Sequence, residues 1–441
     1  MQKFFTVLLA LSLGVASAQL TFWTTEEQPE RMAIQNQIAA DFEAATGTSV
    51  TVVPVTESQL AERVTAAFAA NDLPDVIFHP VNYALGWAEA GVIDTAAATE
   101  LIEMLGRDTF GSAALDLVEF GGEFTSVPAD GWTQLLLYRA DLFEAAGLEP
   151  PTSYEAILAA VEALHDPPNM YGFVAATDPS QDYMMQVFEH FALANGVHLV
   201  DDDGNVSLDV PQMVETLEFY RQIAEASPPG NLYWLQSREL YQDGRAAMIV
   251  WSPFIIPSLV GLRDEVPVTA DADQYSGWLA EQTEFVTRIA GPSNPDGAGW
   301  AQLQYFAITV DADIDTAQEF VSYLLGDGYL DWMSMAPQGK FPVRSGTPEE
   351  PDRFSQGWAT LPIGVDRFQP LSDFYDADVI ASIVEGLETG SRWGFGQGEG
   401  ALVGSLYGTR VMAELVREYL DGDRSAEETA RLMQERVEGL R

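Results

Sequence analysis

The chain has 441 residues, a formal net charge of −46 and no cysteine. This length exceeds what one hydrophobic core usually serves, so we expect two lobes. The 67 acidic against 21 basic residues disfavour nucleic acid and anionic membrane surfaces as partners. The negative electrostatic field of these acidic residues also disfavours a free anion as ligand, although one Arg close to the ligand is able to override it.

The one-sided charge predicts that thermal stability rises with ionic strength, because salt screens the self-repulsion of a chain with this excess of acidic residues. Melting temperatures measured from low to molar salt test this expectation. A melting temperature that does not change with salt concentration contradicts the electrostatic argument but not the predicted fold. The composition fits a saline habitat, or equally a GC-rich genome with generic solubility.

A secretory signal peptide is predicted over residues 1–18. It combines Lys3, an apolar run over 4–15, and the small residues Ala16 and Ala18 at the cleavage site. The apolar run is too short to span a bilayer comfortably. We therefore expect export to the periplasm or the extracellular space. Without Cys the mature protein is not expected to be a lipoprotein or to hold disulfides.

The later apolar stretch "AAMIVWSPFIIPSLVGL" is broken by Pro253 and Pro257, so no membrane span is predicted in the mature chain. The mature chain opens with "LTFW", which reads as a short buried strand. A helix follows, which starts at Pro29 and carries Ile34, Ile38 and Phe42 at four-residue spacing until Gly47 stops it.

Strand and helix then alternate. "TSVTVVPV" reads as a strand, a helix carries Leu60, Val64 and Phe68, and "DVIFH" is the next strand. Such alternation predicts mostly parallel sheets with helices on both faces. Ligands bind at the carboxyl ends of strands in these sheets. The corresponding segments are Trp23 to Glu27, His79 to Tyr83 and Asp130 to Trp132.

Two motifs have ordinary explanations. "DDDGNVSLD", residues 201–209, is superficially similar to a calcium loop, but it lacks the required Gly at its sixth position and has Gln212 where Glu is needed. A surface hairpin turn is preferred. "GFGQGEG", residues 394–400, lacks dinucleotide spacing. It is predicted as a flexible loop that brings Arg392, Trp393 and Phe395 to a cleft.

No metal site or Ser nucleophile is predicted. The four His residues show no metal-ligand spacing and no Gly-x-Ser-x-Gly elbow occurs. Glu26 with Asp130 remains open as a carboxylate pair for glycoside hydrolysis, although such pairs arise by chance in so acidic a chain. No cofactor is expected.

Aromatic residues at predicted strand ends and loops are more informative. Their rings are able to cover the C–H face of a sugar while neighbouring carboxylates and amides bond its hydroxyls. Core packing is the alternative for each, and most specifically for Trp251, which ends the apolar run "AAMIVW". The residues are Trp23, Trp132, Tyr183, Trp251, Trp300 and Trp393.

Taken in order, several stretches resemble extracellular solute-binding proteins of ATP-binding-cassette importers, of the maltose-binding type. They are "LTFWTTEEQPERMAIQNQIAADFEAATGTSVTVVPV", "LPDVIFHP", "SVPADGWTQLLLYRADLFEAAGLEPPTSYEAI", "YQDGRAAMIVWSPF" and "DTAQEFVSYLLGDGYLDWMS" followed by "GKFPVR". The resemblance covers nearly the whole mature chain.

The resemblance implies a two-lobed α/β fold with the ligand in the cleft at the hinge. It places the N-terminal lobe at 19–127 plus 303–342 and the C-terminal lobe at 128–302 plus 343–441. Chain crossings are implied near Val127 and Pro128, near Gln302 to Gln304, and near Phe341 to Arg344. Arg344 is read as a hinge support.

The implied function is capture of a neutral mono- or oligosaccharide by hinge closure, without chemistry, for delivery to a membrane permease. A monomer is expected. The alternatives are a binder of a glycerophosphodiester or other non-sugar solute, and a secreted carbohydrate-active enzyme. The predicted ligand-binding residues are Trp23, Thr25, Glu26, His79, Asn82, Asp130, Trp132, Tyr183, Trp251, Ser252, Trp300, Gln304 and Trp393.

Overall fold

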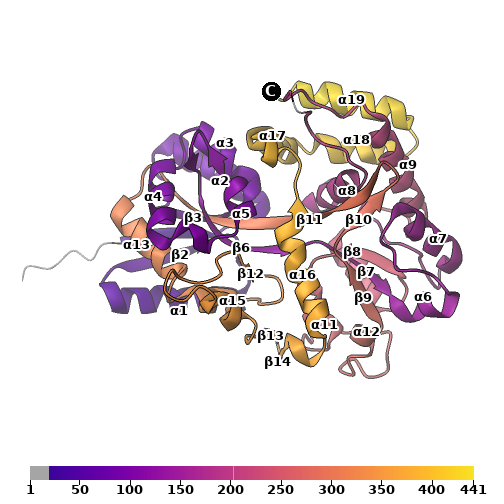
Figure 1. Ribbon diagram of the computed structural model, residues 1–441, viewed down its shortest axis with the longest axis horizontal. Helices are drawn as coiled ribbons and strands as arrows, with labels where there is room; N and C mark the ends of the chain where they lie inside the picture. The colour runs from indigo at the N-terminus through magenta and orange to yellow at the C-terminus, as the bar shows by residue number, and fades with distance from the viewer. Residues whose placement is uncertain (1–18, 202) are drawn as a thin grey trace, which may run out of the picture.

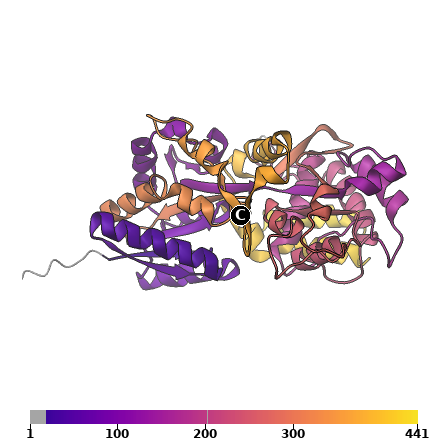
Figure 2. The same cartoon turned by 90° about the horizontal axis from the view of Figure 1, so that it is seen from below.

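Two lobes lie side by side in the computed structural model, which describes residues 19–201 and 203–441 (Figures 1 and 2). The α/β fold class and the two-lobed architecture are confirmed. The predicted signal peptide, residues 1–18, lies outside the described residues. We call the lobe that contains the first strands and helices of the described chain the first lobe, and the other the second lobe.

The first lobe is built on a mixed sheet with the strand order β12-β6-β11-β3-β1-β2, and β10 and β15 pair with the other end of β11, toward the second lobe (Figure 1). β1 pairs in parallel with β2 and β3, as predicted, whereas β11 is antiparallel to β3 and β6. The strands are β1 (Gln19–Thr24), β2 (Ser49–Pro54), β3 (Val76–Pro80), β6 (Val127–Thr133), β10 (Ile289–Gly291), β11 (Asn294–Ile308), β12 (Phe341–Pro342) and β15 (Gly390–Ser391).

The first helix shows why local sequence determines these elements. Pro29 stands in its first turn, Ile38 and Phe42 are buried, and Gly47 ends it with a φ of 83°, a left-handed conformation that glycine adopts without steric cost. In the next helix Leu60 and Val64 are buried as predicted. The helices and the small hairpin of this lobe are α1 (Pro29–Thr46), α2 (Glu57–Ala70), η1 (Val81–Tyr83), α3 (Ala84–Glu89), α4 (Thr95–Leu105), η2 (Arg107–Thr109), α5 (Ser112–Asp116), β4 (Glu119–Phe120), β5 (Glu123–Phe124), α13 (Ile314–Leu324), α14 (Tyr329–Ser334) and α15 (Arg353–Trp358).

The second lobe holds a three-stranded sheet in which β7 (Leu135–Arg139) lies between β8 (Met248–Trp251) and β9 (Thr283–Val286). Both pairings are antiparallel, so this sheet differs from the mostly parallel pairing that we predict, because hydrophobic patterns do not report strand direction. Its helices are α6 (Ala140–Ala146), α7 (Tyr154–Leu164), α8 (Asp182–Ala194), α9 (Pro211–Glu225), α10 (Trp234–Gln242), η3 (Pro253–Ile255), α11 (Ile256–Leu259), α12 (Trp278–Glu281), α18 (Val411–Leu420) and α19 (Ala426–Glu438).

Strands β6 and β11 run from one lobe into the other (Figure 1). The chain then stays with the first lobe beyond the crossing that we predict near Phe341 to Arg344. Arg344 donates to the carbonyl oxygens of Leu325 (2.5 Å) and Leu105 (2.6 Å) of that lobe, so it supports the first lobe rather than the hinge. The second lobe is reached near Val365, whose backbone N–H donates to Leu262.

The C-terminal region returns to the hinge before it ends on the second lobe. Helix α17 packs against α3 and η1 of the first lobe, and α18 and α19 pack against α9. The lobe boundaries stay a prediction, but these contacts show that parts of 343–441 lie on first-lobe elements. The elements are β13 (Pro362–Gly364), β14 (Phe368–Pro370), η4 (Leu371–Asp373), α16 (Ala377–Thr389), η5 (Phe395–Gln397) and α17 (Gly400–Thr409).

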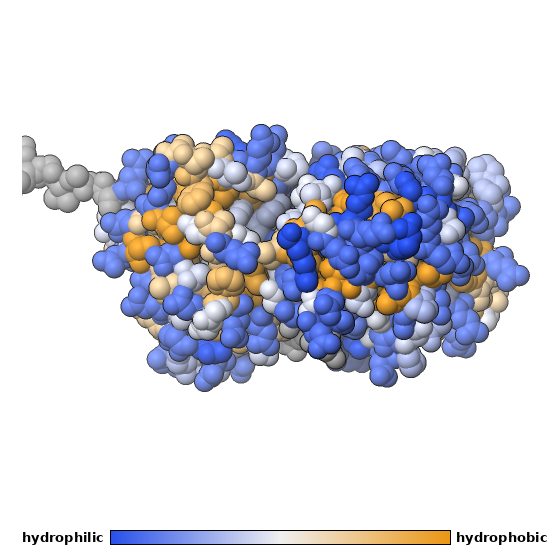
Figure 3. All heavy atoms as spheres, turned by 90° about the horizontal axis from the view of Figure 1, so that it is seen from above, coloured by the Kyte–Doolittle hydropathy of each residue, from blue (hydrophilic) through white to orange (hydrophobic). Residues whose placement is uncertain are grey.

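On the face shown in Figure 3, hydrophilic residues cover much of both lobes and the surface is hollowed between them. None of the helices in the described ranges combines the length and the apolar content that a bilayer crossing requires.

Candidate ligand-binding cleft

A cavity of about 980 Å³ lies between the lobes, and residues of both lobes line it. The first lobe contributes the loop after β1, the start of α2 and the segment after α14. The hinge strands contribute Asp130, Trp132, Gln302 and Gln304, and the second lobe contributes side chains of α8, α10 and the end of β8. A volume of this size is typical of small-molecule sites.

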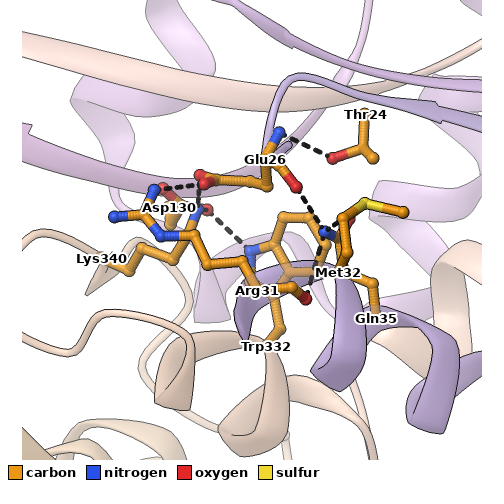
Figure 4. Close-up of polar contacts among 8 residues, drawn as sticks. All are labelled: Thr24, Glu26, Arg31, Met32, Gln35, Asp130, Trp332 and Lys340. Atoms are coloured by element: carbon orange, nitrogen blue, oxygen red, sulfur yellow. Dashed lines mark hydrogen bonds and ion pairs between the residues drawn. The ribbon is translucent and has the colours of Figure 1, made fainter. Parts of the chain in front are cut away.

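Lys340 is the centre of a charged cluster on the first-lobe side of the cavity (Figure 4). Its Nζ lies 2.6 Å from Oε1 of Glu26 and 3.1 Å from Oδ2 of Asp130. Arg31 pairs with the other carboxylate oxygen of Glu26. The indole Nε1 of Trp332 donates to Asp130 Oδ2 at 2.7 Å. Each charge in this buried cluster therefore has a partner, as buried charges require.

The two carboxyl groups of this cluster have opposite pKa shifts. Burial raises the pKa of Glu26, but the positive charges of Arg31 and Lys340 outweigh burial and bring it to about 2. Burial also raises the pKa of Asp130, and the negative charge of Glu26 raises it further. The positive charge of Lys340 lowers it, but the pKa of Asp130 stays above its ordinary value. Glu26 is therefore ionised over the physiological range.

Local hydrogen bonds hold Glu26 at the edge of the cavity. Its backbone N–H donates to Oγ1 of Thr24 at 3.1 Å, and its carbonyl accepts from Nε2 of Gln35 at 2.9 Å. Lys340 follows Gly339, where an added Cβ would lie 2.3 Å from the Phe254 ring. Because Phe254 belongs to the second lobe, glycine at 339 allows the two lobes to approach closely.

The second-lobe wall is aromatic. The rings of Tyr183 and Trp251 are 5.8 Å apart, and those of Trp234 and Trp251 are 5.7 Å apart at 65°. The hydroxyl of Tyr183 donates to the carbonyl of Val250 at 2.6 Å, which fixes its ring in the wall. Trp234 is 41 % exposed, so one ring of this row is open to a ligand.

Behind the cavity, buried groups orient two amide side chains that face it. Arg392 Nη1 donates to Oε1 of Gln302 at 2.8 Å, and Nδ1 of His190 lies 2.9 Å from Oε1 of Gln134. Arg392 also bonds Glu189 Oε1 at 3.0 Å. Gln302 and Gln134 line the cavity, so their positions depend on this buried network.

Many of the predicted site residues line the cavity: Thr25, Glu26, Asp130, Trp132, Tyr183, Trp251, Ser252 and Gln304. Their role in ligand binding remains a proposal. The structure places the other predicted residues outside the cavity wall.

On the first-lobe side, Trp23, His79 and Asn82 do not line the cavity. Trp23 lies on β1 itself and packs against the core under α2, with Arg63 5.5 Å from its ring. His79 is fully buried, donates from Nδ1 to Pro80 O at 2.8 Å, and burial lowers its pKa to about 4. His79 is covered because β11 pairs alongside β3 as far as Pro80. Asn82 is buried against Arg392, whose Nη2 donates to its Oδ1 at 3.3 Å.

Trp300 and Trp393 are also buried behind the cavity. The Trp300 ring lies 5.4 Å from Trp132 and has the Arg392 guanidinium 4.4 Å from its centre. Trp393 donates from Nε1 to the carbonyl of Val197 at 2.8 Å. The expectation that the loop at 394–400 brings Arg392, Trp393 and Phe395 to the cleft is therefore wrong, since all three side chains are buried in the hinge-side core.

Sequence reasoning missed Lys340, Arg31 and Trp234, all of which line the cavity. The amino-acid composition could have pointed to Lys340. Lys340 is the single Lys after Lys3 in the whole sequence, and a lone Lys in a chain that otherwise uses Arg marks a position worth inspecting for a compact ammonium. No comparable signal distinguishes Arg31 or Trp234 from surface residues.

The turn predicted at 201–209 is confirmed. Asp201 Oδ1 accepts from the backbone N–H of Asp203 at 3.0 Å and of Asn205 at 2.8 Å, and Val200 pairs antiparallel with Val206. Across the described ranges there is no group of three or more His, Cys, Asp and Glu side chains with the arrangement of a metal site.

The sequence and the fold of this chain are similar to those of known proteins. Residues 37–363 match the family model described as bacterial extracellular solute-binding protein. The chain belongs to this family. Membership supports a periplasmic or extracellular location.

Relatives of this solute-binding protein agree with the assignment. It is 26 % identical over 334 residues to Escherichia coli (strain K12) YcjN, whose name describes an ABC transporter periplasmic-binding protein; the match covers 74 % of this chain and 73 % of YcjN. A sugar transporter structure from Arthrobacter chlorophenolicus A6, with bound laminaribiose, superimposes with a TM-score of 0.75 at 17 % identity, covering 96 % of this chain and 99 % of that one. A solute-binding protein from Thermotoga lettingae TMO with alpha-D-tagatose gives 0.72 at 20 % identity, covering 96 % and 100 %.

Proposed function

We propose that this solute-binding protein is the substrate-binding component of an ABC-type importer, and that it captures a mono- or oligosaccharide by hinge closure and delivers it to a membrane permease. The observation that carries the proposal is the cavity of about 980 Å³ whose walls come from both lobes. A ligand that contacts both walls stabilises the closed arrangement by its differential affinity for it. No chemical change in the ligand is needed.

The cavity walls suit a carbohydrate. Trp234 offers an open ring face for the C–H face of a sugar and Trp251 backs it in the cavity lining, while Gln302 and Glu57 offer groups that bond hydroxyls. The bound sugars of the Arthrobacter and Thermotoga structures support the same class. A glycerophosphodiester or other non-sugar solute is the weaker alternative.

The proposal includes export by residues 1–18, release without a lipid anchor, and action as a monomer whose two lobes both face the permease. Release without an anchor rests on the absence of Cys from the sequence. No nucleic acid partner is expected for a chain of net charge −46.

A binding role also fits the carboxylates better than an enzymatic one. Glu26 and Asp130, the pair considered for glycoside hydrolysis, both contact Nζ of Lys340, at 2.6 and 3.1 Å. The ammonium therefore occupies the space between them, where a glycosidase would need the scissile bond. We propose that the protein leaves oligosaccharides intact, which product analysis after prolonged incubation checks.

A thermal-shift panel on residues 19–441 tests the proposal, after partial unfolding and refolding to remove bound ligand. The panel holds mono- and oligosaccharides, polyols, glycerophosphodiesters and amino acids. A saccharide at a hundredfold excess over its dissociation constant is expected to add about 2.7 kcal/mol to the free energy of unfolding. A shift with an amino acid or phosphodiester, and with no sugar, contradicts the carbohydrate class.

Small-angle X-ray scattering of the same samples tests hinge closure. The radius of gyration is expected to fall when the active saccharide is added and to stay constant with an inactive one. Trp251→Ala is expected to remove both the thermal shift and the contraction, because it deletes a ring of the second-lobe wall. Trp87→Phe, a conservative change on α3 of the first lobe away from the cavity lining, serves as the control.

A further inference from the structure

Arg238 stands out on the second-lobe wall because, among the described residues, it forms no ion pair. It lies on α10 four residues after Trp234, and its guanidinium is 5.3 Å from the centre of that ring. In the part of the chain that the structure describes, its Nε is buried without a hydrogen-bond partner and no carboxylate lies within ion-pair distance. A buried donor left unpaired costs free energy that a ligand acceptor is able to offset.

The other basic side chains of the cavity differ from Arg238. Arg31 and Lys340 pair with Glu26, Arg263 pairs with Glu265 at 2.9 Å, and Arg410 lies 3.9 Å from a carboxylate oxygen of α8. Among the described basic residues of the lining, Arg238 therefore differs in having no ion pair. One unpaired guanidinium matches one carboxylate better than it matches a phosphate dianion.

Arg263 reinforces this end of the cavity. It lines the same wall, and its Nε is also buried without a partner, although Nη2 contacts Glu265, whose side chain is 80 % exposed. Burial lowers the pKa of Arg238 and the positive charge of Arg263 lowers it further, while the negative charges of Glu239 and Glu265 oppose this shift without cancelling it. The structure thus holds two guanidinium groups near each other in a cavity, an unfavourable arrangement that a bound anion relieves.

Composition makes this arrangement informative. The cavity lining holds five of the 21 basic residues of the sequence, together with eight acidic residues. The basic ones are Arg31, Arg238, Arg263, Lys340 and Arg410. Among the described residues, the carboxylates nearest to Arg238 in the lining, Glu239 and Glu265, act on it electrostatically without forming an ion pair with it. A guanidinium without an ion pair beside two Trp rings points to a ligand that brings a negative charge itself.

We propose that the second-lobe wall receives a carboxylate-bearing sugar unit, whose ring face lies against Trp234 or Trp251 and whose carboxylate accepts hydrogen bonds from Arg238 and Arg263. This inference rests on the proposed carbohydrate-binding function and names its ligand class more closely. It replaces the neutral sugar expected from composition with a sugar acid, because the local guanidinium groups override the field of the whole chain.

Isothermal titration of the refolded protein tests the inference with matched probes. These are mono- to trisaccharides of glucuronate, galacturonate and mannuronate, the methyl ester of each, and the corresponding hexose 6-phosphates. One free acid is expected to bind about ten- to a hundredfold more tightly than its own methyl ester, as a charge-assisted hydrogen bond predicts. The difference in affinity between the free acid and its methyl ester is expected to decrease as salt concentration rises.

Variants locate the effect. In Arg238→Gln the preference for acid over ester is expected to fall to near unity, while Arg238→Lys retains part of it because charge remains without the planar fork. The matched control is Arg353→Gln, an Arg on α15 that pairs with Asp327 at 3.2 Å and lies outside the cavity lining. A shared melting temperature for the variants shows that the fold is intact.

Each other outcome overturns a distinct statement. Binding of neutral saccharides with no preference for their acids overturns the sugar-acid inference but leaves the carbohydrate proposal standing. Tighter binding of a hexose phosphate than of the sugar acids contradicts the proposal that the ligand carries a carboxylate, but supports a subsite for an anionic group. Failure of every saccharide, charged or neutral, overturns the proposed function together with the inference.

Discussion

Replacing Lys340 with Met is expected to lower the free energy of unfolding by about 3–5 kcal/mol, because it leaves buried carboxylates without their counter-charge. The side chain of Lys340 is 1 % exposed, and its Nζ contacts both Glu26 and Asp130. Urea unfolding followed by Trp fluorescence measures the change. Arg353→Met is the control, and it is expected to cost less than about 1 kcal/mol because its pair with Asp327 is exposed.

The pH dependence identifies the origin of that loss. The pKa of Glu26 is about 2, below its ordinary 4.5, so its stabilising contribution is present above pH 4.5 and is lost as the pH falls toward 2. Without Lys340 the pKa of Glu26 rises, since Arg31 alone opposes burial. The stability difference between the two proteins is therefore expected to shrink as the pH falls below 4.5. A difference that does not change with pH would point to lost packing rather than lost charge pairing.

Replacing Arg392 with Met is expected to have an effect of similar size, about 3–5 kcal/mol, because Glu189 then loses its buried partner. The two side chains are 1 % and 0 % exposed, and Tyr407 donates to Glu189 Oε2 at 2.7 Å. Arg392 further bonds Asn82 at 3.3 Å and Gln302 at 2.8 Å. Because Gln302 lines the cavity, ligand affinity is expected to fall as well.

A double-mutant cycle separates charge from packing at this site. Arg392→Met with Glu189→Gln is expected to recover part of the stability lost in Arg392→Met, since the unpaired carboxylate is removed. Arg392→Lys is expected to recover little, because a single ammonium does not reach the several acceptors that the planar guanidinium serves. If the two single changes simply add in the double variant, the ion pair is not the source of the stability.

The amino-acid sequence determined those features that depend on neighbours in the chain. The helix from Pro29 to Thr46 follows from an apolar spacing and a terminal Gly47, and the turn at Asp201 follows from side chains that bond their own backbone. The cap at Ser425, whose hydroxyl accepts from the N–H of Glu428, is equally local.

Which residues face the cavity depends on tertiary contacts. Trp251 ends an apolar run and Trp393 precedes a glycine-rich segment, yet Trp251 lines the cavity and Trp393 is buried behind it. Lys340 meets Asp130 across 210 residues of chain, and Arg392 meets Asn82 across 310. Local pattern specifies whether a side chain is apolar and which element holds it. Whether the other lobe and the hinge strands cover that side chain depends on contacts between segments that are distant in the sequence. No local sequence pattern contains this information.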